Sequence, residues 1–103
     1  SDQSADVFVV DVCGGRAALE ICTQLRAGDI RAERSWDDRS MKAQMKAANR
    51  SGARFAVIVG EDEHRTETAV IRDLRSDADQ VSVPRSELVS SLNTRLSSLQ
   101  GAE

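Results

Sequence analysis

The stretch that decides the predicted fold is Gly52-Ala53-Arg54-Phe55-Ala56-Val57-Ile58-Val59-Gly60-Glu61-Asp62-Glu63. Its apolar residues 55–59 show no polar alternation and are too few for a buried helix, so they predict a strand covered on both faces. Gly60 follows, and we expect it to free the backbone where the strand ends. Open α/β sheets place ligand sites at the carboxyl ends of their strands, so the three carboxylates after Gly60 are expected at a binding edge.

The composition indicates one domain with an uneven charge distribution. The chain has 103 residues and a formal net charge of −3. Residues 26–54 carry eight basic side chains against four acidic ones, whereas residues 60–80 carry three against seven. The net charge alone argues against a nucleic-acid partner, since phosphate binding depends on clustered Lys and Arg, but the basic middle segment provides such a cluster. Residues 1–6 are expected to be a linker cut from a longer protein, and residues 7–100 the folded domain.

Cysteine spacing and hydropathy argue against a metal-binding protein and against a membrane-spanning protein. Cys13 and Cys22 fall at positions where apolar residues are expected, without CxxC spacing or a His-Cys ligand set. This pattern predicts no metal site and a reducing, cytoplasmic environment. No apolar run approaches membrane-spanning length, so no membrane partner is expected.

The residues up to 34 predict two strands with a helix between them. Residues 7–12 form a β-branched strand, and the glycine pair after it leads into a helix from Arg16 that ends at Gly28. The pair lacks a GxGxxG or GKS/T pattern, which favours a tight turn over a phosphate loop. Residues 30–34 alternate apolar and charged, as an edge strand does. Trp36 is either a lid on the core, the favoured interpretation, or a base-stacking residue.

A second helix is predicted over residues 39–50, capped by Asp37 or Asp38. Its expected inward positions are Met41, Met45 and Ala48. The outward positions form a basic ridge, made of Arg39, Lys42, Lys46 and Arg50. The ridge is either an ordinary solvated face or a binding surface.

The remaining residues predict two more strands and a last helix. Residues 64–67 are expected to form a polar turn, followed by strands at 68–75 and 80–83. Pro84 is expected in the first helical turn, before an apolar stripe that must pack on the sheet: Leu88, Val89, Leu92, Leu96 and Leu99. Right-handed crossovers then give a three-layer α/β/α fold with a mixed five-stranded sheet of order 2-1-3-4-5, strand 4 being antiparallel.

The sequence shows no nucleophile with a base, no metal-ligand set and no phosphate loop, so no catalytic residue is predicted. A binding module is favoured. A small α/β enzyme that uses Glu61 with Glu63 as a carboxylate pair is a further alternative.

Four segments resemble the C-terminal anticodon-binding domain of histidyl-tRNA synthetase, a class IIa aminoacyl-tRNA synthetase module. They are residues 40–46, 52–63, 70–75 and 83–89, and the most specific is the join of GARFAVIVGEDE to IRDLR. The resemblance as a whole covers almost all of the chain, from Val7 to Leu99. The module family carries a glycine, two residues and a glutamate, which here are Gly60 to Glu63.

The resemblance implies roles for individual residues. Glu63 would accept hydrogen bonds from an anticodon base, with Glu61 and Gly60 beside it on the same edge. Arg72 would reach the anticodon loop, and Gln44 would contact a base or face the core. The phosphate-binding residues would be Arg39, Lys42, Lys46 and Arg75.

The resemblance also implies a parent enzyme, a homodimeric histidine-tRNA ligase that uses ATP and Mg²⁺ in a separate catalytic domain. This domain would then bind the anticodon stem-loop of histidine tRNA, need no cofactor and perform no chemistry. The alternative is a related module used for protein-protein or other RNA contacts.

Overall fold

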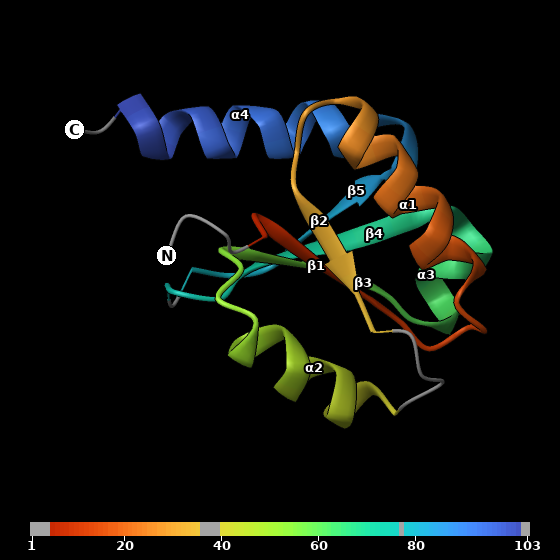
Figure 1. Ribbon diagram of the computed structural model, residues 1–103. Helices are drawn as coiled ribbons and strands as arrows, with labels where there is room; N and C mark the ends of the chain where they lie inside the picture. The colour runs from red at the N-terminus through yellow and green to blue at the C-terminus, as the bar shows by residue number, and fades with distance from the viewer. Residues whose placement is uncertain (1–4, 36–39, 77, 102–103) are drawn as a thin grey trace.

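The described residues form a five-stranded sheet in the order β2-β1-β3-β4-β5. Figure 1 shows the helices arranged around this sheet. The structure is a computed structural model that describes residues 5–35, 40–76 and 78–101. The elements in chain order are β1 (Val7–Asp11), α1 (Arg16–Ala27), β2 (Ala32–Arg34), α2 (Met41–Arg50), β3 (Phe55–Val59), α3 (Glu61–Thr66), β4 (Thr68–Asp73), β5 (Val81–Pro84), the 3-10 turn η1 (Arg85–Glu87) and α4 (Leu88–Gly101).

The predicted topology is confirmed. β1 pairs in parallel with β2 and β3, whereas β4 is antiparallel to both β3 and β5. The carboxyl ends of β1, β2, β3 and β5 therefore meet at one edge of the sheet, which we call the carboxyl edge. The opposite edge, where β3 begins and β4 ends, is the amino edge.

The layers are also those expected, with α1 and α4 on one face of the sheet and α2 on the other (Figure 1). The larger core lies under α1 and α4 and includes Ile21, Leu25, Leu92 and Val57. The core under α2 is smaller among the described residues, and its buried members there are Phe8, Val10, Ala48 and Ala53. α2 packs mainly on β1, so the same face of β3, β4 and β5 is less covered. Ile58 and Val70 are half-buried there, while Arg72 is exposed.

The region after β3 differs from the expected turn. Residues 61–66 form the short helix α3, because three acidic residues occupy its first turn, where they stabilise the positive end of the helix dipole. Glu67 then ends α3 in a left-handed conformation, with φ of 56°. This lets the chain reverse directly into β4.

Two helix starts also differ from the prediction. The side chain of Ser40, not an aspartate, caps α2 by accepting a hydrogen bond from the Ala43 amide at 3.2 Å. Trp36, Asp37 and Asp38 lie outside the described residues. Pro84 ends β5 in an extended conformation and precedes η1, so the first α-helical residue is Leu88. The proline suits both positions, since its fixed φ fits a strand end as well as a helix start.

The apolar stripe of α4 is only partly covered. Leu88 and Leu92 are buried and Leu96 packs on the core, but Leu99 is 36% exposed. The helix outruns the sheet, as Figure 1 shows, so its last turns have no strand beneath them.

The folded unit begins before β1. Ala5 is buried, and the main chain of Asp6 is hydrogen-bonded to Arg31, Arg54 and Phe55. Of the expected linker, Ala5 is therefore packed against the fold and Asp6 is hydrogen-bonded to the ends of the neighbouring strands. Within the described residues no helix combines the length and the apolar character needed to cross a membrane.

Candidate functional site

The loops after β1 and β3 lie next to each other at the carboxyl edge. The Val12 amide donates to the Val59 carbonyl at 3.3 Å, which continues the pairing of the two strands to their ends. The carboxylates of Glu61 and Glu63 act electrostatically on Cys13. The three carboxylates after Gly60 therefore lie at the carboxyl edge, as expected.

Gly60 and Glu63 form a fixed unit within this edge. Glu63 Oε1 accepts a hydrogen bond from the Gly60 amide at 2.9 Å. Gly60 has φ of −92°, a conformation open to any residue, so the expected need for backbone freedom is wrong. A Cβ on Gly60 would instead lie 2.9 Å from Glu63 Oε1, which is too close. A larger residue here would fit only if the Glu63 carboxylate moved away from the backbone, so glycine lets this carboxylate approach the Gly60 amide.

The three carboxylates of α3 differ in what they contact. Asp62 pairs with Arg65 at 2.8 Å on the exposed surface. Glu63 is half-buried and uses one oxygen on Gly60. Glu61 is exposed and makes no hydrogen bond or ion pair with any other described residue. Glu61 and the second oxygen of Glu63 thus remain as acceptors at the edge.

Asp11 is a structural residue of this edge that sequence analysis missed. The residue is 5% exposed, and its carboxylate accepts hydrogen bonds from the Cys13 amide at 2.6 Å and the Ala18 amide at 2.9 Å. It thereby caps α1 in place of the N-cap residue Gly15, which has no side chain to do so. The signal was present, since a carboxylate ends a buried strand before a helix whose own cap position is glycine.

Gln44 faces the core, which was one of its two expected orientations. The side chain is 3% exposed. Its Oε1 accepts from the Asp11 amide at 3.0 Å, and its Nε2 donates to the Asp11 carbonyl at 2.8 Å. Met41, expected inward, is instead 37% exposed. Its Cε lies 4.0 Å from a Cβ built on Gly60, so α2 begins beside the carboxyl edge.

Among the described residues, the cations predicted to contact RNA, at phosphates or in the anticodon loop, are not gathered in one place. Lys42 and Lys46 are exposed on α2, as expected, and Arg39 lies outside the described residues. Arg72 is exposed on the α2 side of β4, opposite Ala56. Arg75 is at the amino edge, far along the sheet from Glu63, where its Nη2 donates to the Gly52 carbonyl at 2.8 Å.

The Cys13 thiol lies near several carboxylates at the carboxyl edge. Desolvation, followed by the nearby carboxylates of Asp11, Glu61 and Glu63, raises the pKa of this thiol. Among the described residues, no group of three His, Cys, Asp or Glu side chains is arranged to hold a metal ion.

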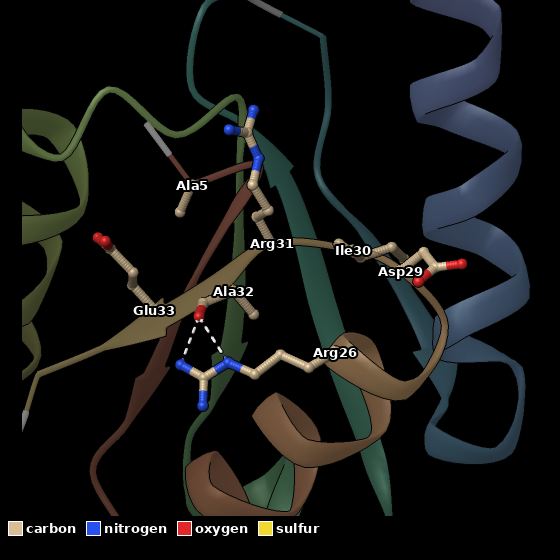
Figure 2. A pocket seen from close by; sticks show the side chains of 7 residues that line it. All are labelled: Ala5, Arg26, Asp29, Ile30, Arg31, Ala32 and Glu33. Atoms are coloured by element: carbon tan, nitrogen blue, oxygen red, sulfur yellow. Dashed lines mark hydrogen bonds between the residues drawn. The ribbon is translucent and has the colours of Figure 1, made fainter. Parts of the chain in front are cut away.

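Two surface hollows flank β2 at opposite edges. One, of about 500 Å³, lies beside the start of β2, where Arg26 donates two hydrogen bonds to the Ala32 carbonyl, as Figure 2 shows. None of the predicted site residues lines it. The other, of about 530 Å³, lies at the carboxyl edge between Gly14, Gly15 and Arg34, and the Nη1 of Arg34 donates to the Gly15 carbonyl at 3.0 Å.

Comparison with known proteins identifies relatives over nearly the whole chain. A histidine–tRNA ligase of Laribacter hongkongensis (strain HLHK9) is 35% identical over 91% of this chain and 23% of its own length. The corresponding protein of Corynebacterium efficiens is 39% identical over 92% of this chain and 22% of its own length. The chain thus spans less than a quarter of these relatives.

A solved structure shares the fold as well as the sequence likeness. The histidyl-tRNA synthetase of Nostoc sp. PCC 7120 superposes with a TM-score of 0.79 at 29% identity, covering 91% of this chain and 23% of that one. A family model described as "Anticodon binding domain" matches residues 6–95. This chain therefore belongs to the anticodon-binding domain family.

Proposed function

We propose that the domain binds the anticodon stem-loop of histidine tRNA, with Glu63 and Glu61 contacting a base and α2 contacting backbone phosphates. The observation that carries this proposal is the bond between Glu63 and the Gly60 amide, which holds a half-buried carboxylate at the carboxyl edge. A group fixed before binding loses little conformational freedom when it binds.

The chemistry of a carboxylate suits a base in a single-stranded loop. Proteins recognise RNA sequence mainly where bases are unstacked, through the Watson-Crick edge. A guanine presents neighbouring N–H donors on that edge, and a carboxylate oxygen accepts from them. The same negative charge repels phosphates, which disfavours binding in other orientations.

The exposed cations of α2 supply the complementary attraction. Lys42 and Lys46 lie on the helix that begins beside Gly60, and neither is paired with another described residue. Each cation that neutralises a phosphate releases counterions, so affinity should fall as salt rises. Arg72, on the less covered face of β4, is assigned to the anticodon loop with the base contacts.

The relatives are several times longer than this chain, which suggests that the chain is one domain of a larger enzyme. We infer that this domain is part of a cytoplasmic histidine–tRNA ligase, and that a catalytic domain elsewhere in that enzyme binds ATP and Mg²⁺ and forms the homodimer. The domain itself is assigned RNA recognition without chemistry.

Binding to short RNAs tests the proposal. The domain is titrated with a histidine-tRNA anticodon stem-loop and with the same stem carrying another anticodon, followed by fluorescence anisotropy and by NMR of backbone amides. We expect tighter binding of the first RNA and shifts at residues 60–63 and in α2. Equal binding of both RNAs, or no shift at either place, would contradict the proposal and favour a module for protein contacts.

A further inference from the structure

The amide of Gln44 takes the place of a strand neighbour for β1. The pairing of β2 with β1 ends at Val9 opposite Arg34, two residues before β1 itself ends. The main chain of Asp11 is the next pairing position, and there Gln44 accepts from the N–H at 3.0 Å and donates to the carbonyl at 2.8 Å. An amide carries the same donor and acceptor as a backbone unit, so it satisfies both groups of a buried strand end.

The side chain of Asp11 extends this contact to α1. Its two oxygens accept from the amides of Cys13 and Ala18. Asp11 therefore has two connections. Its main chain is bonded to α2 through Gln44, and its carboxylate is bonded to the loop after β1 and to the start of α1. We call this arrangement of Gln44 and Asp11 the buried clamp.

The packing of α2 gives little directional support of its own. Its fully buried residues are Gln44 and Ala48, and the core beneath it is small. The apolar contacts of the helix itself come from Ala48 and from the partly buried Met45 and Ala47, and short or flexible side chains restrain a helix less than several large buried ones. A pair of buried hydrogen bonds, in contrast, tolerates only one position of the helix.

We propose that Gln44 is a positioning residue that fixes the spacing between the cationic face of α2 and the carboxyl edge. The inference rests on the proposed function, because the spacing matters only if one RNA contacts both places. Two contacts made by the same ligand reinforce each other only when the geometry lets them form together. Loss of the clamp should therefore reduce discrimination between anticodons, although Gln44 contacts no base.

Gln44→Glu tests the donor atom while keeping the shape of the side chain. An ionised glutamate cannot donate to the Asp11 carbonyl, but a protonated one can. Burial of this side chain favours the neutral form and raises the pKa of the new carboxyl above about 4.3. The clamp is then intact below this raised pKa and is lost as the pH rises through it.

The measured quantity is the ratio of affinities for the two stem-loops, relative to wild type at each pH. We expect the Gln44→Glu ratio to match wild type near pH 5 and to fall about tenfold by pH 8, which corresponds to the loss of one net hydrogen bond. Gln24→Glu is the matched control, since Gln24 is exposed on α1 and the charge change is the same. The Gln24→Glu variant should leave the affinity ratio unchanged at both pH values.

A second variant keeps the test decisive if Gln44→Glu unfolds at high pH. Gln44→Ala is combined with Glu63→Ala in a double-mutant cycle at pH 7. If the clamp positions α2 for Glu63, removing Glu63 should cost less discrimination once Gln44 is gone. Additive losses, or a Gln44→Glu ratio that does not change with pH in a folded protein, would overturn the inference. A wild-type domain that does not discriminate would instead overturn the proposed function, and the positioning role with it.

Discussion

The two edges of the sheet carry similar charges but use them differently. At the amino edge, Arg54 donates two hydrogen bonds to the Asp73 carboxylate, each of 2.9 Å. The Arg75 amide donates to the same carboxylate, and its guanidinium donates to the Gly52 carbonyl. These charged groups hold the start of β3 to the end of β4. Their hydrogen-bonding groups therefore already have partners within the folded domain.

At the carboxyl edge, Asp11 and Arg34 are bonded within the fold, but other charged side chains on α3 and α2 are left to the solvent. Glu61 and Lys42 are exposed and make no pair with another described residue, and Glu63 uses one oxygen on Gly60. The comparison teaches that a count of charges does not locate a binding surface. What distinguishes the two edges is whether the side chains already have partners in the folded protein.

The largest expected effect is at Glu63. Glu63→Ala should reduce discrimination between cognate and non-cognate stem-loops by about 10- to 100-fold, the range for hydrogen bonds to a charged group. Gly60→Ala should have a similar effect, because the new Cβ would displace the carboxylate from 2.9 Å. Anisotropy titrations measure both, with thermal unfolding as the check on folding. A Gly60→Ala domain that discriminates normally would show that the bond to Gly60 is not needed.

The next effect should be on stability alone and at the amino edge. Asp73→Asn should destabilise the domain by about 1 kcal/mol at pH 7, since a partly buried, two-point pair is replaced by a neutral amide. Chemical denaturation measures this. RNA discrimination should stay as in wild type, and a change in it would remove the distinction between the edges.

The same pair predicts a pH dependence. The hydrogen bond from Arg54, opposed by desolvation, lowers the pKa of the Asp73 carboxyl below its ordinary value. Its contribution is therefore present above a pH of about 4 and is lost as the pH falls through the lowered folded-state pKa. Asp73→Asn should flatten the stability profile in that acidic range. Denaturation curves between about pH 2 and 6 measure it, and parallel profiles would contradict the prediction.

A smaller effect is expected for Lys42. Lys42→Ala should weaken binding of both stem-loops several-fold and equally, and should reduce the slope of log affinity against log salt by about 0.7 to 0.9. Salt titrations measure the slope. A selective loss for the cognate RNA would place Lys42 on a base rather than on a phosphate.

The smallest effect should come from Arg75, the cation that sequence analysis grouped with Lys42. Because its guanidinium bonds Gly52 at the amino edge, Arg75→Ala should change RNA affinity by less than about twofold. A loss as large as that of Lys42→Ala would show that the RNA extends to the amino edge.

Much of the fold was predictable because apolar periodicity is a local signal. The run 55–59 gave the central strand, and Gly28 gave the end of α1. The acidic run after Gly60 was harder, since its helix depends on charges at the first turn and on the Glu63 bond, whereas the pattern also suited a turn. The leucine stripe of α4 predicted a buried face, but not that the sheet would end before Leu99.

The candidate site was predictable in part. Gly60, Glu61 and Glu63 were expected at the carboxyl edge and lie there. The roles of Gln44 and Arg75 could not be settled from the chain, because each depends on a backbone group 33 or 23 residues away.

The sequence by itself determined the order of the elements, the strands of the sheet and membership of the family, because short-range hydrophobic spacing and glycine positions encode them. The tertiary structure alone decided which polar groups are paired. Asp11 with Gln44, and Arg54 with Asp73, meet only when distant segments fold together. No local pattern specifies such partners, and at the amino edge they leave the charged side chains already bonded within the fold.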